Sequence, residues 1–371
     1  MTFTSARSRL QVPASLCFFF ILTFSASTRA TIQYEVLLDH PERHFFHVTM
    51  TIPDVTAEVV VRMPAWNALY QIRDFSSHVR QVEAFADSRK AFIEKVDKQT
   101  WRIKGTGTIK ISYATYWDEA GPFASQLNSE HAFINPAMIL LYVPERRSEN
   151  VKLSIPNPPD NWRAESASNG GFESMGGARA FFFEAPSYDA LADGPIEVGK
   201  FEEFQLTGIN PDIWVVVHGD NWKKKQVEED LRRICKYELK LMDGAPFKRY
   251  TFILHIGKGA GGGGMEHADS TAIGAYSDEY LPGVAAHEFF HLWNVKRIRP
   301  ASLEPMDDTK EQYTRALWFA EGGTNTYGSY TLVRSGIWNK EQFYADLGEQ
   351  ITELEGRPAN RWQVNPALVE A

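Results

Sequence analysis

The sequence is poor in cysteine, and its one markedly apolar run near the N-terminus is short. Cys17 and Cys235 are the two cysteines among 371 residues. The apolar run, residues 14–24, has eleven residues, which is too few to span a bilayer as a helix. No internal repeat, coiled-coil heptad or low-complexity tract stands out. We therefore expect stability to come from apolar cores, and the aromatic content of 13% suits such packing.

The first thirty residues have the layout of an export signal. Two arginines precede the apolar run, and Thr28 and Ala30 supply the small residues that a signal peptidase requires. We expect residues 1–30 to be a signal peptide and the protein to be exported, to the periplasm or outside the cell. Cleavage would leave Cys235 alone, with no intrachain disulfide and no stable membrane span. The alternative is an uncleaved N-terminal anchor.

Acidic residues outnumber basic ones. The chain has 47 Asp and Glu against 39 Lys and Arg, a formal net charge of -8. Removing residues 1–30 takes away three arginines and no acid, which moves the net charge to -11. Because binding to a phosphate backbone requires a basic surface, this balance argues against a nucleic-acid partner. The sequence gives no indication of the oligomeric state.

Residues 31–200 carry a pattern with a period near two. Short segments rich in β-branched and aromatic residues alternate with turn formers such as "DHPE" and "PNPPDN". Many short strands with little helix predict an N-terminal β-sandwich-like domain over this range. Strands are expected at residues 31–38, 44–52, 57–63, 100–105, 108–116, 137–143 and 151–155.

Residues 201–371 mix strand and helix signals, so the chain as a whole is expected to be α+β. Apolar residues at helical spacing follow the first strand, and Gly244 ends that helix. The last expected helix has Phe343, Leu347, Ile351 and Leu354 on one face. Strands are expected at 212–219 and 250–256, and helices at about 227–242, 284–296, 314–329 and 341–355.

The segment "HEFFH" places two histidines four residues apart. In a helix, His287 and His291 project from the same face and can reach one metal ion through their imidazole nitrogens. Glu288 lies about 100° further round the helix, where it can contact a water on that ion. A buried helix that happens to contain polar residues is the alternative, but it carries a desolvation cost.

A hydrolytic zinc ion needs a third protein ligand and one open position. Glu321 follows the largely apolar residues 316–320, so we predict that a second helix presents it as this ligand. Two imidazoles and a carboxylate would leave one zinc ion with a positive charge, enough to lower the pKa of a bound water to about 7. A solvent-exposed glutamate at a helix end is the alternative.

Asn325 lies four residues beyond Glu321, on the same helix face. We predict that it can hold a zinc histidine through the second ring nitrogen, which would fix the tautomer and orientation of that ring. A neutral amide does this less strongly than a carboxylate. An ordinary polar surface position is an equally open interpretation of Asn325.

The glycine-rich stretch at residues 257–267 follows a predicted strand. Its glycines match a dinucleotide fingerprint literally, but no helical period follows, which argues against that motif. We expect the glycines to let an extended substrate backbone approach an edge strand, with Gly264 and Met265 in contact with substrate. Glu266 would then receive the substrate's ammonium group. A surface loop is the alternative.

Together these segments resemble the glycyl aminopeptidase family of zinc peptidases, which belongs to the gluzincin group with aminopeptidase N. "HEFFHLWNVKRIRP" is similar to the family signature, "GGGMEH" to its exopeptidase motif and "LWFAEG" to the segment with the third ligand. Farther back, "MPAW", "YQIRDF" and "DGPIEVGKFE" look like its N-terminal β domain.

The resemblance implies a thermolysin-like catalytic domain over residues 201–371 and an aminopeptidase that prefers glycine or other small N-terminal residues. It also implies a helical region beyond residue 371, so we expect the catalytic domain to be incomplete here. Peptides with a free N-terminus would be the substrates. Two alternatives stay open: an endopeptidase using the same centre, and a non-catalytic zinc-bearing protein that binds peptides.

Overall fold

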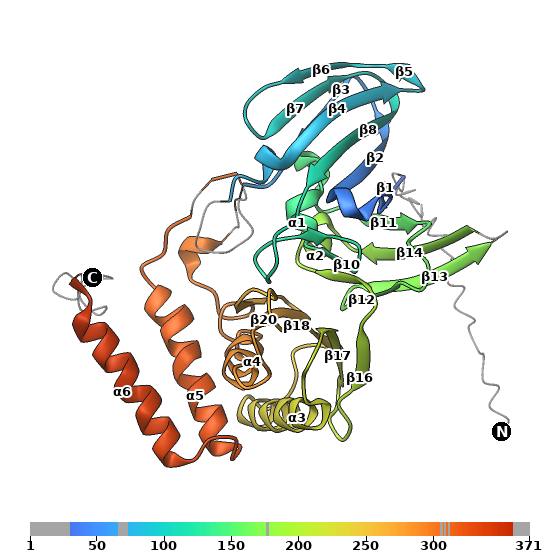
Figure 1. Ribbon diagram of the computed structural model, residues 1–371. Helices are drawn as coiled ribbons and strands as arrows, with labels where there is room; N and C mark the ends of the chain where they lie inside the picture. Colours follow the sequence, from blue (N-terminus) through green and yellow to red (C-terminus); the bar gives the residue numbers. More distant parts are fainter. Residues whose placement is uncertain are drawn as a thin grey trace, which may run out of the picture.

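The computed structural model describes residues 30–65, 73–175, 178–304, 307, 309–310 and 312–358 (Figure 1). The expected signal peptide lies outside the described residues except for Ala30. Two parts follow one another along the chain. We call residues 32–199 the N-terminal β region and residues 202–356 the C-terminal α/β region. Figure 1 shows the first above the second, with two helices standing at one side.

An eight-stranded sheet dominates the N-terminal β region. Burial alternates along several of its strands: on β1, Ile32, Tyr34 and Val36 face the core while Gln33 and Glu35 are exposed. One pair, β1 with β11, is parallel, and the other pairs are antiparallel. The order is β13 (Asn169–Met175), β14 (Ala178–Ala185), β11 (Val151–Pro156), β1 (Ile32–Leu37), β2 (Phe45–Val55), β8 (Gly107–Tyr116), β4 (Val79–Ala86) and β5 (Arg89–Lys90).

Two smaller sheets complete this region. The three-stranded sheet shares one apolar core with the large sheet, since Val61 and Ile103 of the former pack in the same cluster as Ile111 of the latter. This β-rich architecture agrees with the sequence prediction. The three-stranded sheet has the order β3 (Glu58–Arg62), β7 (Thr100–Lys104) and β6 (Phe92–Lys95). The four-stranded sheet has the order β12 (Arg163–Ser166), β15 (Ile196–Gly199), β10 (His131–Ile134) and β9 (Gln126–Leu127).

The prediction of a strand at residues 137–143 is wrong. This buried segment begins with a short helix, α1 (Pro136–Ile139), and continues as irregular backbone. A proline at the first helical position favours the turn, and an apolar run alone does not distinguish buried helix from buried strand. Backbone carbonyls of Ile139, Leu140 and Leu141 accept hydrogen bonds from three tyrosine hydroxyls instead of from a sheet neighbour. The donors are Tyr113, Tyr188 (in α2, Tyr188–Ala192) and Tyr34, each at 2.9 Å.

The C-terminal α/β region is built on a five-stranded sheet with a parallel centre. Strands β17, β18 and β20 run parallel, and the edge strands β16 and β19 are antiparallel to their neighbours. Strand β17 coincides with the predicted range, and β18 begins one residue earlier than expected. The order is β16 (Glu202–Gln205), β17 (Asp212–Gly219), β18 (Arg249–Ile256), β20 (Ser270–Ala275) and β19 (Gly263–Glu266).

The two faces of this sheet meet different partners. Phe252 and Leu254 of β18 belong to the core shared with α3 (Lys224–Leu241) and α4 (Leu281–Phe290), so these helices cover one face. Ile253, which alternates with them, packs against Phe133 of β10 in the N-terminal β region. The opposite face therefore forms the junction between the two regions.

The helices after α4 differ from the predicted ranges. Residues 314–329 were expected to form one helix, but a π-helix occupies Trp318–Gly323 and α5 runs from Thr324–Arg334. α6 (Lys340–Gly356) matches the last prediction closely, yet Leu347, Ile351 and Leu354 on its apolar face are 41–49% exposed. Among the described helices, none is long and apolar enough to cross a membrane.

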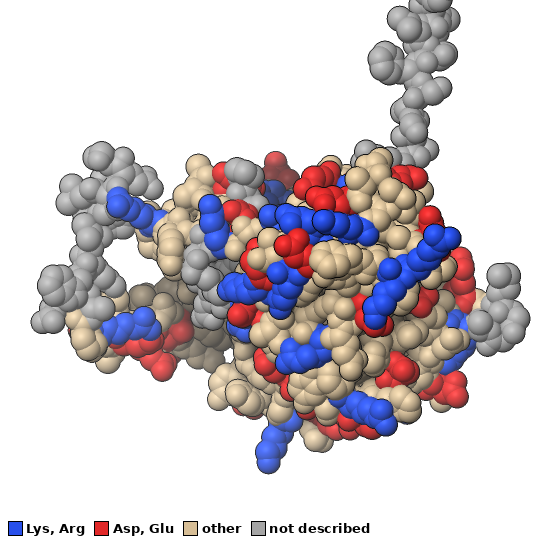
Figure 2. Space-filling view, turned by 90° about the horizontal axis from the view of Figure 1, so that it is seen from above, with Lys and Arg blue, Asp and Glu red and all other residues tan. Residues whose placement is uncertain are grey.

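Charged side chains of both signs are intermingled on the described part of the face seen in Figure 2, which looks down on the N-terminal β region. Several are paired across neighbouring strands. Arg102 of β7 lies between Glu94 and Glu58, at 2.9 and 3.7 Å. Pairs this exposed contribute little to stability, so the fold depends on the apolar cores beneath them.

Replacing Leu231 with alanine tests the packing of α3 on the sheet. Leu231 is fully buried, so we expect its loss to lower the free energy of unfolding by about 2–5 kcal/mol. Urea unfolding followed by circular dichroism measures this change. Lys236→Ala, on the exposed side of the same helix, is the control and should stay within about 0.5 kcal/mol of the parent. Equal effects of the two substitutions would contradict the packing described.

Candidate metal centre

The two histidines of "HEFFH" come together at the end of α4. His287 lies in the last turn, and His291 is the C-cap residue with backbone angles that are still helical, φ -58° and ψ -18°. The expected helix over 284–296 therefore ends earlier than predicted, but the four-residue spacing still stacks the two side chains. Their Nε2 atoms are 2.9 Å apart.

Glu321 reaches the same point from the π-helix. Its Oε2 atom lies 3.3 Å from His287 Nε2 and 3.6 Å from His291 Nε2. The carboxylate is half-buried, whereas the preceding Ala320 is fully buried against the core. The local widening of a π-helix often occurs at functional sites, and here it occurs where Glu321 turns toward α4. The structure thus brings together the three residues that the sequence predicts as ligands.

Each imidazole is oriented by a hydrogen bond at its other nitrogen. His287 Nδ1 lies 2.9 Å from Asn325 Oδ1, and His291 Nδ1 lies 2.9 Å from the backbone oxygen of Asn294. Since both oxygens only accept, Nδ1 must carry the hydrogen in each ring. The Nε2 atoms of both rings then face one another and are the nitrogens that can bind a metal ion. Asn325 thus stands where the sequence predicted a residue that fixes the tautomer.

Asn294 is a site residue that the sequence analysis missed. Its buried amide nitrogen donates to the backbone oxygens of Phe319 and Ala320, at 2.9 and 3.2 Å, and to Thr324 Oγ1 at 3.0 Å. These bonds join the end of α4 to the π-helix that carries Glu321. Its position three residues after the second histidine could have drawn attention to it. The partners themselves could not be predicted, because they lie 25 to 30 residues away in the sequence.

Glu288 is buried beside this constellation. The residue is only 5% exposed, and its Oε2 atom has no hydrogen-bond partner among the described residues. Burial, together with the nearby carboxylates of Glu266 and Glu321, raises the pKa of Glu288 well above its usual value. A buried carboxylate with an unused oxygen is suited to take a proton from a reacting molecule.

Strand β19 lies against Glu288 and forms an edge of the sheet. A Cβ atom on Gly264 would approach the Glu288 side chain to 2.3 Å, so a glycine is required at this position. Glu266, Glu288 and His291 offer ligand atoms that lie within 4.8 Å of one another. Met265 is only 4% exposed, and its sulfur accepts a hydrogen bond from Asn135 of the N-terminal β region. Its side chain is thus packed against the N-terminal β region and its backbone oxygen accepts a hydrogen bond from Thr271, while contact of Met265 with substrate stays a prediction.

The residues present fit a zinc ion. Imidazole nitrogens and a carboxylate oxygen are the donors that zinc prefers, and three of them leave one position open. The two Nε2 atoms face one another and the Glu321 carboxylate, so a cation among them, either a proton or a zinc ion, stabilises the arrangement. Burial would lower the pKa of His291, but Glu321, Glu266 and Glu288 raise it to about 9, because the surrounding carboxylates stabilise positive charge here. Burial would raise the pKa of Glu321, but the neighbouring imidazoles of His287 and His291 outweigh it and hold that pKa well below its usual range.

Comparison with solved structures places this fold among zinc metallopeptidases. An aminopeptidase N family protein from Idiomarina loihiensis is 28% identical, with a TM-score of 0.77 over 84% of this chain and 56% of its own. A two-domain M1 zinc metallopeptidase bound to L-tryptophan is 14% identical, with a TM-score of 0.52 over 89% of this chain and 76% of its own. An M1 zinc metallopeptidase mutant from Deinococcus radiodurans, bound to a Tyr-Ser-Ala substrate, is 12% identical, with a TM-score of 0.51 over 87% and 74%.

Family models identify the chain more closely. Residues 33–200 match the peptidase M61 N-terminal domain, and residues 281–367 match the M61 glycyl aminopeptidase model. The chain belongs to the M61 family of peptidases, as its motifs suggested, and such relatives imply a zinc cofactor. It spans 56% of the length of the Idiomarina protein. No curated protein sequence matches the chain.

Substituting Asn325 tests the hydrogen bond to His287. We expect Asn325→Ala to weaken zinc binding by about 10–100-fold, because the His287 ring loses the partner that fixes its tautomer. Competition with a chelator measures the affinity. Thr326→Ala removes a neighbouring hydroxyl that bonds only within the helix, to the Gly322 oxygen, and should leave zinc affinity unchanged. Equal zinc affinities for the two variants would contradict the predicted role of Asn325 in holding His287.

Proposed function

We propose that this protein is a zinc-dependent aminopeptidase that hydrolyses the N-terminal peptide bond of peptides. The observation that carries the proposal is the convergence of His287, His291 and Glu321. Beside them lies a carboxylate oxygen of Glu288 that has no hydrogen-bond partner in the described part of the chain. Zinc bound there would supply Lewis acidity, which polarises the scissile carbonyl and makes water more acidic. One ion suffices for this chemistry.

Glu288 acts as the general base and then as the general acid. It takes a proton from the attacking water and passes it to the leaving amine. Its burial supports this role, because a raised pKa allows the carboxylate to hold the proton between the two steps. His287, His291 and Glu321 hold the cation, and Asn325 and Asn294 keep the two imidazole rings in position.

Glu266 makes the enzyme an exopeptidase. It lies at the end of β19, an edge strand along which an extended peptide can bind as an added strand, and Gly264 lets that backbone approach closely. The Glu266 carboxylate binds the substrate's ammonium group, so that the first peptide bond is the one presented to Glu288. Its closeness to Glu288 and His291 supports this arrangement.

The comparisons support both the reaction and the substrate class. The matched family model is a glycyl aminopeptidase, and the solved relatives bind a free amino acid and a tripeptide substrate. We therefore propose a preference for glycine or other small N-terminal residues. The layout of residues 1–30 supports a site of action in the periplasm or outside the cell.

Replacing Glu288 with glutamine tests the proton-transfer role. We expect turnover of a glycyl anilide to fall by about 10²–10⁴-fold while the zinc content stays the same, because the substitution keeps the shape but removes the base. Steady-state assays and elemental analysis measure the two quantities. Glu279→Gln, at an exposed position before α4, should keep full activity. Undiminished turnover by Glu288→Gln would reject the assignment.

Replacing Glu266 with glutamine tests recognition of the free N-terminus. We expect kcat/KM for peptides with a free amine to fall by about 10–100-fold, the effect of losing one charge-assisted hydrogen bond. N-acetylated peptides, which lack that charge, should be poor substrates for parent and variant alike. If the parent cleaves acetylated peptides as fast as free ones, the enzyme is an endopeptidase.

A further inference from the structure

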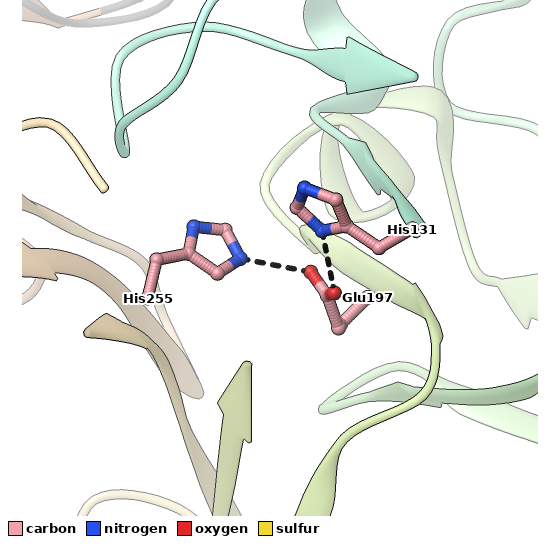
Figure 3. Close-up of side chains that lie close together, drawn as sticks. All are labelled: His131, Glu197 and His255. Atoms are coloured by element: carbon pink, nitrogen blue, oxygen red, sulfur yellow. Dashed lines mark hydrogen bonds and ion pairs between the residues drawn. The ribbon is translucent and has the colours of Figure 1, made fainter. Parts of the chain in front are cut away.

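A second cluster of metal-binding residue types lies at the junction of the two regions. His131 Nδ1 is 2.8 Å from Glu197 Oε1, and His255 Nε2 is 2.9 Å from Glu197 Oε2 (Figure 3). All three residues are buried, and Glu197 is fully inaccessible. None of the three belongs to the candidate metal centre, and none is among the site residues predicted from the sequence.

The fold brings these side chains together from three strands. His131 and Glu197 come from β10 and β15, which pair in the N-terminal β region. His255 comes from β18 and alternates with Phe252 and Leu254 in the way that Ile253 does, so it projects from the sheet face opposite α3 and α4. Figure 3 shows His255 approaching the carboxylate from the other region.

The hydrogen bonds around His131 fix which nitrogen carries the hydrogen. The side-chain nitrogen of Gln126 donates to Asp118 at 3.1 Å, which turns the Gln126 oxygen toward His131 Nε2 at 3.2 Å. Because that oxygen only accepts, Nε2 of His131 must be protonated. A neutral His131 therefore presents a bare Nδ1 to the Glu197 carboxylate. That contact is stable only if a cation lies in it, either a second proton on the ring or a metal ion.

The charge of Glu197 leads to the same requirement. The ion-pair partners of this carboxylate within the described chain are the imidazoles of His131, His255 and His218, and none is a lysine or arginine. A fully buried carboxylate is costly unless a positive charge accompanies it. With Glu197 fully buried between His131 and His255, the compensating cation must lie among the imidazoles.

His218 of β17 lines the cluster without entering it. Its ring stacks on that of His131, with centroids 3.9 Å apart, and its Nδ1 lies 3.2 Å from the Lys200 oxygen and 3.9 Å from Glu197 Oε1. A pocket of about 550 Å³ opens beside the three histidines and is lined further by Glu130 and Asp220. Lys258 lines it as well, so the two carboxylates outnumber the one ammonium group and favour entry of a cation.

We propose that His131, Glu197 and His255 bind a divalent transition-metal ion, in a site separate from the hydrolytic centre. The ligands would be Nδ1 of His131, Nε2 of His255 and the Glu197 carboxylate. Imidazole donors select transition metals such as zinc over magnesium or calcium. The Gln126 oxygen on Nε2 of His131 is then the outer hydrogen bond that holds a metal-binding imidazole in its tautomer. The ion joins the two regions, because its ligands come from both.

Counting bound zinc in variants of the full chain tests this site. We expect about two zinc ions in the parent and one in the variant His287→Ala/His291→Ala, which lacks the hydrolytic ligands. Adding Glu197→Gln to that variant should remove the remaining ion. Elemental analysis after loading with excess Zn²⁺ and desalting gives the count, and circular dichroism verifies the fold. In the one-ion variant, Zn²⁺ should also raise Tm, because an ion that binds only the folded state stabilises it.

His218→Phe is the matched control. It keeps a ring stacked on His131 but removes an imidazole that is outside the proposed ligand set, so the ion should be retained. The proposal is overturned if His287→Ala/His291→Ala folds and holds no zinc, or if the parent never exceeds one ion and loses it with His287→Ala/His291→Ala. A different result is expected if only the hydrolytic centre fails to bind zinc. The parent would then hold one ion, which Glu197→Gln would remove and His287→Ala/His291→Ala would leave in place.

Discussion

The candidate metal centre depends on two hydrogen bonds to oxygens that can only accept. The Asn294 backbone oxygen and the Asn325 amide oxygen each take the hydrogen on one imidazole Nδ1. This leaves both Nε2 lone pairs converging on one point, where Glu321 adds a carboxylate. A cation, either a proton or a metal ion, stabilises this arrangement, and hydrogen bonds from neighbouring residues hold the ligands in place. Asn294 contributes to this from both ends, since its oxygen orients His291 and its amide nitrogen anchors the π-helix.

The sheet of the C-terminal α/β region connects that centre with the rest of the molecule. One face carries α3 and α4, and therefore the histidines of the centre. On the other face, Ile253 and His255 contact Phe133 of the N-terminal β region. The edge strand β19 lies beside Glu288 and is tied to Asn135 through Met265. The N-terminal β region thus supports both the strand expected to bind substrate and the second histidine cluster.

Local patterns predicted much of the fold and most of the candidate site. Alternating burial on β1 and the apolar strands β17 and β18 followed from periodicity, because one or both faces of these strands are buried. The strand predicted at 137–143 was wrong. Three backbone carbonyls of this apolar segment accept hydrogen bonds from tyrosine hydroxyls of distant elements, and not from a neighbouring strand. The single helix predicted at 314–329 is interrupted by a π-helix around Glu321, where the distant Asn294 donates hydrogen bonds to two backbone carbonyls.

The sequence by itself determined the spacing of His287 and His291, the glycine before Glu266 and the class of chemistry, because helix and strand geometry convert short spacings into shared faces. Only the tertiary structure decided that the Asn294 backbone oxygen orients His291, and that His131, Glu197 and His255 meet at all. Those three residues come from strands far apart in the chain, and no local period relates them. Their meeting follows from how one sheet packs across another, which depends on the whole core.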